Sequence, residues 1–107
     1  MAIQVTGTLL DACVLAMLAE EDKYGYSLTQ EVRKTLDISE STLYPVMRRL
    51  QTEQCLTTYD LPYSGRNRRY YKITEKGLDK YRMCVEEWES FKLRIDSIFG
   101  GNHYDSK

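Results

Sequence analysis

Histidine, proline and long apolar runs are scarce in this 107-residue chain, which has one histidine and two prolines. No apolar stretch approaches the roughly 20 residues that a transmembrane helix needs, so we expect no membrane partner. Residues 1–5 lack the basic and apolar regions of an export signal, which favours a cytoplasmic location. The length is that of one domain with one hydrophobic core.

Cysteine occurs in an odd number and without the spacing of a disulfide framework or a Cys-x-x-Cys metal site. Cys13, Cys55 and Cys84 are therefore expected to be buried thiols. The single histidine, His103, lies in a polar tail and has no nearby nucleophile or metal ligand. There is also no Gly-rich phosphate loop and no carboxylate pair with a partner base. We predict no metal site, no cofactor and no enzymatic activity.

The chain has no net positive charge, but its middle part is net basic. The net charge is -1, which by itself argues against nucleic acid as a partner. Residues 33–72, however, carry eight bases and four acids, a net charge of +4. Neutralising DNA phosphates depends on such local Lys and Arg side chains and not on the charge of the whole protein. The distribution favours a basic face in the middle third.

Three short helices are predicted in the first half of the chain. Thr6 or Thr8 can cap the first helix, and Ser39 can cap the third. Pro45 belongs in or just beyond the first turn of the third helix, because proline deep in a helix costs about 3 kcal/mol. That helix should therefore start near Ser39 to Ser41. Apolar residues recur at helical spacing over residues 8–19, 28–36 and 43–50.

A two-stranded hairpin is predicted after the third helix, with strands over residues 56–63 and 69–73 and a turn over 64–67. If Ile73 packs inward, the period of two puts Tyr71 and Arg69 on the same face. Tyr70, Arg68 and Lys72 then lie on the other face, so that the tip and outer face of the hairpin are basic.

A long final helix follows, capped by Thr74 and carrying an apolar stripe as far as Phe99. Gly100 and Gly101 should end it. The fold class is thus mainly α with a small two-stranded β-hairpin, a winged helix-turn-helix with one long C-terminal helix. Its parts are expected at residues 6–73 for the DNA-binding region, 74–99 for a dimerisation helix and 100–107 for a flexible tail.

The third helix of a winged helix-turn-helix enters the major groove and the hairpin lies beside it. Polar residues off the apolar stripe of that helix could contact DNA, although each could equally be an ordinary capping or solvated residue. The hairpin bases are harder to explain without an anion, because they repel one another. The candidate DNA-binding residues are Ser39, Ser41, Thr42, Tyr44 and Arg48 in the helix and Gly65, Arg66, Arg68, Arg69 and Lys72 in the wing.

Three motifs follow one another along the chain: Tyr24-Gly25-Tyr26-Ser27-Leu28, Ser41-Thr42-Leu43-Tyr44-Pro45 with Arg49-Leu50, and the run from Gly65 to Gly77. In this order they resemble the motifs of the PadR-type transcriptional regulators, the phenolic-acid decarboxylase repressor family. The single helix after the wing is similar to the subfamily with a short C-terminal region. The resemblance implies a repressor that binds double-stranded DNA as a homodimer on a two-fold symmetric operator.

The apolar stripe agrees with a dimer, because its distal half would otherwise form a large exposed patch. The resemblance also places an aromatic residue, here Trp88, beside a central cavity that takes flat hydrophobic ligands in some relatives, although packing alone would also explain a tryptophan there. A winged-helix module that binds only protein is the alternative function. The predicted interface residues are Leu10, Val14, Tyr81, Val85, Trp88, Phe91, Ile95 and Phe99.

Overall fold

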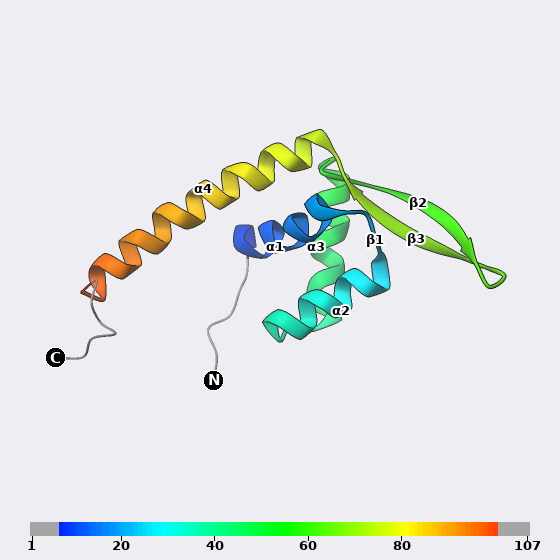
Figure 1. Ribbon diagram of the computed structural model, residues 1–107, viewed down its shortest axis with the longest axis horizontal. Helices are drawn as coiled ribbons and strands as arrows, with labels where there is room; N and C mark the ends of the chain where they lie inside the picture. Colours follow the sequence, from blue (N-terminus) through cyan, green and yellow to red (C-terminus); the bar gives the residue numbers. More distant parts are fainter. Residues whose placement is uncertain (1–6, 101–107) are drawn as a thin grey trace.

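The computed structural model describes residues 7–100 and shows four α-helices and a three-stranded antiparallel sheet within that range (Figure 1). Thr6, His103 and all of the predicted tail except Gly100 lie outside the described residues. The elements, in chain order, are α1 (Gly7–Glu20), β1 (Lys23–Tyr24), α2 (Gly25–Leu36), α3 (Glu40–Thr52), β2 (Leu56–Tyr63), β3 (Arg66–Ile73) and α4 (Glu75–Ile98).

The three predicted short helices are confirmed, and their apolar stripes meet in one core. Pro45 is the sixth residue of α3 and is exposed, so its ring disturbs no packing although it cannot donate to the carbonyl of Ser41. Tyr81 near the start of α4 and Tyr71 and Ile73 at the base of the hairpin pack against this core. The buried core residues are Leu10, Val14, Leu15, Leu18, Leu28, Val32, Leu43, Met47, Leu50, Cys55 and Leu56.

The cysteines are all free thiols within the described part of the chain. Cys55 and Cys84 are buried as expected, and burial raises the pKa of the Cys84 thiol. Cys13 is only half-buried, because it borders a shallow groove between α1 and α2 that also contains Met17 and Leu36.

The sheet has the order β1-β3-β2, so the predicted hairpin gains a short third strand. In β1, Lys23 pairs with Tyr71 and Tyr24 pairs with Tyr70. A strand of two residues is too short to show an alternating pattern in the sequence. The strand β1 forms because its backbone pairs with the edge of β3. The strand β3 also begins three residues earlier than predicted, at Arg66, so the loop of the hairpin has only two residues.

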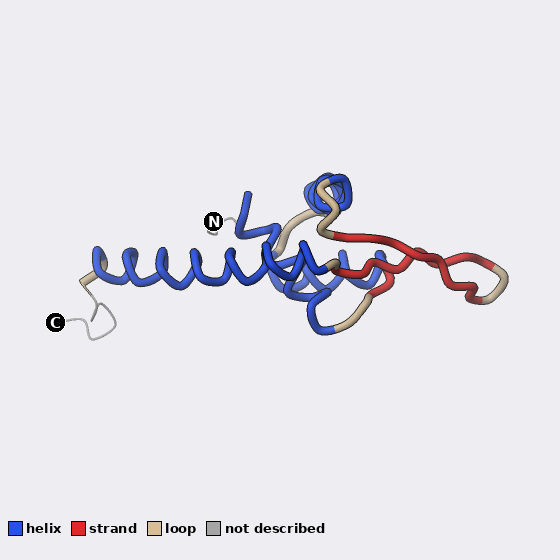
Figure 2. Tube along the Cα trace, turned by 90° about the horizontal axis from the view of Figure 1, so that it is seen from above, coloured by secondary structure: helices blue, strands red, loops and turns tan. Residues whose placement is uncertain are grey.

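The hairpin and α4 extend from the core in opposite directions along one axis (Figures 1 and 2). The described chain measures 61 × 29 × 21 Å and has a radius of gyration of 16.4 Å. A compact domain of this length would have a radius of gyration of about 13 Å. No described helix combines the length and apolar character that crossing a membrane would require.

The N-terminus of α4 is fixed tightly against the rest of the molecule. Thr74 is its N-cap, as predicted: the hydroxyl accepts a hydrogen bond from the Gly77 N–H at 3.0 Å and donates one to the carbonyl of Gln54 at 2.7 Å. Gly77 is buried, and the backbone carbonyl of Cys55 lies where a Cβ on Gly77 would be. Glycine is therefore required for α4 to lie this close to the end of α3.

Replacing Gly77 with alanine should lower the free energy of unfolding by roughly 1–3 kcal/mol, because backbone must move to admit the methyl group. Urea denaturation followed by circular dichroism measures this loss. The neighbouring Lys76→Ala substitution is the control, since Lys76 is exposed. Equal stability of the two variants would show that α4 does not need this close approach.

Candidate nucleic-acid interface

The solvent face of α3 carries the polar residues predicted to contact DNA. Leu43, Met47 and Leu50 are buried on the opposite face, and they fix the rotation of the helix about its axis. Tyr44 is 39% exposed even though it is aromatic. The exposed polar residues on this face, counting the N-cap position, are Ser39, Ser41, Thr42, Tyr44 and Arg48.

Three hydroxyl groups gather at the N-terminus of α3. The Ser39 Oγ lies 2.9 Å from the Ser41 Oγ and 3.1 Å from the Thr42 Oγ1. Ser39 occupies the N-cap position but makes no side-chain cap, so the predicted capping bond is absent. The hydroxyl groups bond to each other instead and remain exposed at the positive end of the helix dipole, where anions are favoured.

The angle between α2 and α3 is held by polar contacts of Glu40. Its Oε2 accepts hydrogen bonds from Gln30 Nε2 at 3.0 Å and Arg33 Nη1 at 3.4 Å, both on α2. The acid is in the first turn of α3, where it also stabilises the helix dipole. Glu40 and Arg33 thus position the two helices of the helix-turn-helix relative to each other.

The wing is a long hairpin closed by a two-residue turn. Ser64 and Gly65 have φ values of 51° and 79°, and two positive φ values are those of a type I′ turn. Gly65 therefore has a conformational role at the tip besides the DNA contact predicted for it. Arg66 follows the turn directly and pairs with Tyr63 in the register.

The two faces of the wing carry the residues that the period of two predicts. Tyr71 and Ile73 pack against the core. Burial raises the pKa of Tyr71, while the charges of Arg69 and Arg48 act in the opposite direction, so this face looks toward α3. Arg69 lies on it and pairs weakly with Asp60 at 3.5 Å.

The other face holds Arg68 between two tyrosine rings. The guanidinium carbon lies 3.7 Å from the ring centroid of Tyr63 and 4.4 Å from that of Tyr24, distances typical of cation–π contacts. Tyr24 comes from β1, so the unpredicted third strand supplies one side of this clamp. The contacts fix the direction of Arg68 and leave its charge without a carboxylate partner among residues 7–100.

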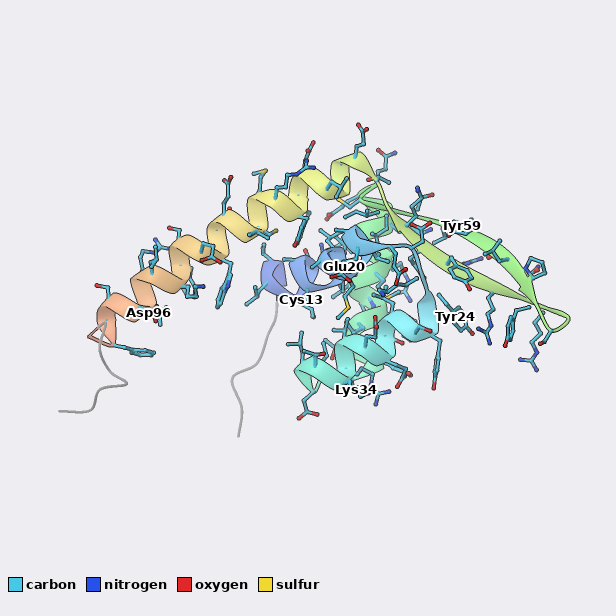
Figure 3. The ribbon with its side chains drawn as sticks, viewed as in Figure 1. Cys13, Glu20, Tyr24, Lys34, Tyr59 and Asp96 are labelled. Atoms are coloured by element: carbon cyan, nitrogen blue, oxygen red, sulfur yellow. The ribbon has the colours of Figure 1, made fainter. Side chains whose placement is uncertain are left out.

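The same face continues as a row of three tyrosine rings, Tyr24, Tyr70 and Tyr59, of which Tyr24 and Tyr59 are labelled in Figure 3. Tyr70 stacks on Tyr59 with centroids 5.6 Å apart and an interplanar angle of 13°, and its ring also contacts Tyr24. The Tyr59 hydroxyl donates to Asp22 at 2.7 Å, which raises the pKa of Tyr59. We did not predict this row, although the alternation of Tyr59, Leu61 and Tyr63 is a signal for it.

Positive charge is left uncompensated along the α3 and wing surface. No ion pair within residues 7–100 involves Arg48, Arg66 or Lys72, and all three are exposed. Exposed bases that lack acidic partners repel one another unless a polyanion lies nearby. This part of the molecule can bind closely spaced phosphates.

The distal half of α4 forms an apolar groove with the start of α1. The groove has a volume of about 580 Å³. Trp88 and Phe91 line it from α4, with ring centroids 6.5 Å apart, and Leu9 lines it from α1. Glu86, Glu87 and Arg94 add charge at its border. The groove could hold either a flat apolar molecule or side chains of another protein.

The predicted interface residues divide into two groups. Leu10 and Val14 lie in the core of a single chain, 2% and 0% exposed, so they have no surface to offer a second copy. Tyr81 packs partly against that core. The stripe continues along α4 beyond the core and becomes exposed there: Val85, Trp88, Phe91 and Phe99 are 37%, 39%, 48% and 58% exposed, and Ile95 is half-buried.

A group of four charged residues that contact one another, Asp11, Arg49, Glu53 and Lys80, was not predicted from the sequence. Asp11 is nearly buried on α1 and bonds to Arg49 of α3 and Lys80 of α4. No spacing rule predicts a contact between residues so far apart in the chain. Within the described range, no group of three His, Cys, Asp or Glu side chains could hold a metal ion.

Comparison with known proteins agrees with the fold and with the motifs. Residues 14–83 match the model of the transcriptional regulator PadR-like family. The transcriptional regulator Rv3488 of Mycobacterium tuberculosis is 35% identical over 93 residues, which cover 83% of this chain and 87% of that protein.

Solved structures agree as well. The structure of smu.1704 from Streptococcus mutans UA159 superimposes with a TM-score of 0.86 at 35% identity, covering 94% of this chain and 95% of that one. A PadR family transcription regulator from Clostridium difficile R20291 gives a TM-score of 0.74 at 27% identity, covering 84% and 96%. The predicted winged-helix fold class and family resemblance are confirmed, and this chain belongs to the PadR-like family of transcriptional regulators.

Proposed function

We propose that this protein is a homodimeric repressor that binds a two-fold symmetric operator in double-stranded DNA. The observation that carries the proposal is the positive charge without a carboxylate partner at Arg48 on α3 and at Arg66, Arg68 and Lys72 on the wing, of which all but the half-buried Arg68 are exposed. Membership of a family of transcriptional regulators supports the same reading. Regulators of this family bind DNA and are generally dimeric.

The placement of the wing bases suits a groove with phosphates on both sides. Arg68 and Arg69 point to opposite faces of β3. The minor groove is about 6 Å wide, so a wing that lies along it has one sugar-phosphate strand on each side. Both arginines would then contact phosphates, while the hydroxyl groups at the start of α3 would face base edges in the adjacent major groove.

The shape of one chain supports a dimer. The distal part of α4 extends away from the core with its apolar residues exposed. Burying a phenylalanine or valine side chain contributes roughly 1.5–3 kcal/mol, so pairing two such helices would release considerable free energy. A dimer formed there presents two α3 helices and two wings, as a two-fold symmetric operator requires.

Thr42→Ala should change which DNA sequences are preferred more than it changes overall affinity. A hydroxyl group directed at a base edge contributes discrimination, and each well-made base contact is worth about 1–3 kcal/mol. Binding selection from a randomised DNA pool measures the preference. Ser27→Ala, at an exposed position on α2, is the matched loss of a hydroxyl group. An identical selected sequence for the Thr42 variant and the wild type would contradict a base contact by this residue.

A flat aromatic compound in the α4 groove should quench the fluorescence of Trp88 and weaken DNA binding. Trp88 is the only tryptophan, so its emission reports on this groove alone. If the ligand lowers the affinity for DNA by separating the two wings, DNA must lower the affinity for the ligand by the same factor. Titration with 2-naphthol, with and without DNA, measures both effects. Quenching with unchanged DNA affinity would mean a ligand site without regulation.

Footprinting on the DNA upstream of the protein's own gene tests the proposed mode of binding. A dimer on a symmetric operator should protect two tracts on one side of the duplex, about 10 base pairs apart or a multiple of that. In vitro transcription from the same fragment should fall as the protein is added. A single asymmetric tract would contradict the dimeric arrangement, and increased transcription would contradict repression.

A protein-binding module is the second candidate, and the exposed apolar and aromatic side chains of β2 on the outer face of the wing favour it. Tyr59, Leu61 and Tyr63 are 36%, 45% and 56% exposed. Tyrosine is enriched where proteins bind each other. Absence of DNA binding by a correctly folded dimer would make this the leading function.

A further inference from the structure

Four alternating charges form a closed ring between α1, α3 and α4. Asp11 accepts from Arg49 Nη2 at 2.5 Å and lies 3.5 Å from Lys80 Nζ. Glu53, at the end of α3, lies 3.4 Å from both Arg49 and Lys80. Each acid therefore touches both bases, and each base touches both acids.

Asp11 is the buried corner of this ring. Its side chain is 4% exposed, whereas those of Lys80, Glu53 and Arg49 are 29%, 40% and 44% exposed. A buried carboxylate is costly unless it is paired, so both cations are held toward it. The hydrogen bond to Asp11 is the main reason that the pKa of Arg49 is raised.

The ring joins two helices that otherwise have little contact. The helix α1 packs against both α3 and α4, while direct packing of α3 on α4 is slight. Among the ion pairs of residues 7–100, those of the ring are the ones that connect α3 to α4. The orientation of α3 relative to α4 therefore depends on Asp11 and its partners, together with the packing of α1 on both helices and the close approach of Gly77 to Cys55.

We propose that Asp11 is a positioning residue for DNA recognition, which sets the angle of α3 against α4 by holding Arg49 and Lys80 together. This rests on the proposed function, in which α4 joins the two copies and α3 reads the groove. In a dimer, a small rotation of α3 against α4 moves both reading surfaces relative to each other. Asp11 would therefore control how well two half-sites are engaged together, without touching DNA.

Two variants loosen the ring in different ways. Asp11→Asn keeps the shape of the buried side chain and removes its charge. Lys80→Met removes only the link to α4, leaves the Asp11–Arg49 pair intact, and keeps the fold testable if the first variant is unstable. Lys76→Met is the matched control, because Lys76 is exposed on α4 one turn earlier.

The distance between α3 and α4 is measured by pulsed electron paramagnetic resonance. Spin labels are attached to p-acetylphenylalanine at the exposed positions Gln51 and Ser97, so the cysteines stay unlabelled. Labelled chains are mixed with excess unlabelled chains, so that each dimer carries one label pair. We expect a broader distance distribution in Asp11→Asn and Lys80→Met and no change in Lys76→Met.

The same variants are titrated with upstream and scrambled DNA. We expect the ratio of the two affinities to fall about tenfold, the value of one good base contact, with little change in affinity for scrambled DNA. A purely structural role would lower the urea midpoint and leave distance distribution and ratio as they were, and this result overturns the inference. If the wild type prefers the upstream DNA and the variants keep the same ratio of affinities, the inference is overturned as well. If the wild-type protein binds upstream and scrambled DNA equally, the proposed function is refuted instead. The distance distributions between the two spin labels then decide whether Asp11 sets the angle between α3 and α4.

Discussion

Replacing Arg68 and Arg69 together with alanine should weaken binding to specific and scrambled DNA alike, by on the order of a hundredfold at moderate salt. The two side chains lie on opposite faces of the wing and neither has a strong carboxylate partner within residues 7–100. Each phosphate contact contributes about 0.9 to the slope of log affinity against log salt. A dimer would lose four such contacts, so the slope should flatten by about 3 to 4.

Fluorescence anisotropy across a salt series measures this change in affinity and slope. The double variant Lys76→Ala with Arg82→Ala is the control, because it removes the same charge from exposed positions on α4. If affinity depended only on net charge, the two double variants would lose it equally. Wild-type affinity and slope in the Arg68 and Arg69 variant would remove the wing from the DNA interface.

Introducing aspartate at Val85 and Phe91 should separate the dimer and abolish tight operator binding. Both residues are exposed in the single chain, and both lie on the stripe that runs along α4 past the core. Pairing would bury them, and an unpaired carboxylate in an apolar interface costs several kcal/mol. The dimer dissociation constant should therefore rise by a hundredfold or more.

Sedimentation velocity distinguishes the 12.6 kDa chain from a species of twice that mass. Leu93→Asp is the matched control, since Leu93 is 66% exposed on α4 but lies off the stripe. A dimer that survives in the Val85 and Phe91 variant would place the interface elsewhere. A dimer lost equally in the Leu93 variant would mean that α4 is covered on both sides.

The elements with a regular period were predictable, because a helix or strand that buries one face must repeat at that period. This holds for the three short helices, for α4 and for the two faces of the wing. The capping of α4 was predictable too, since Thr74 precedes a long apolar stripe. The hydroxyl groups around Ser39 show the limit: residue type indicated a cap, but Ser41 and Thr42 compete for the same hydroxyl.

Features that depend on distant residues were not predictable. The strand β1 exists through its pairing with Tyr70 and Tyr71, nearly fifty residues later. Leu10 and Val14 share the spacing of an interface stripe, and only the fold places them in the core of one chain. The same holds for Asp11, whose neighbours on the sequence are apolar and whose ionic partners come from two other helices.

The most direct test of the account is the affinity of the wild-type dimer for the DNA upstream of its own gene, measured beside a scrambled fragment of equal length. Specific binders prefer their sites by roughly 10³ to 10⁷. We predict a preference of at least about a hundredfold in this fragment, with affinity that falls steeply as salt rises. Equal and weak binding to both fragments would contradict sequence recognition by α3 and the wing.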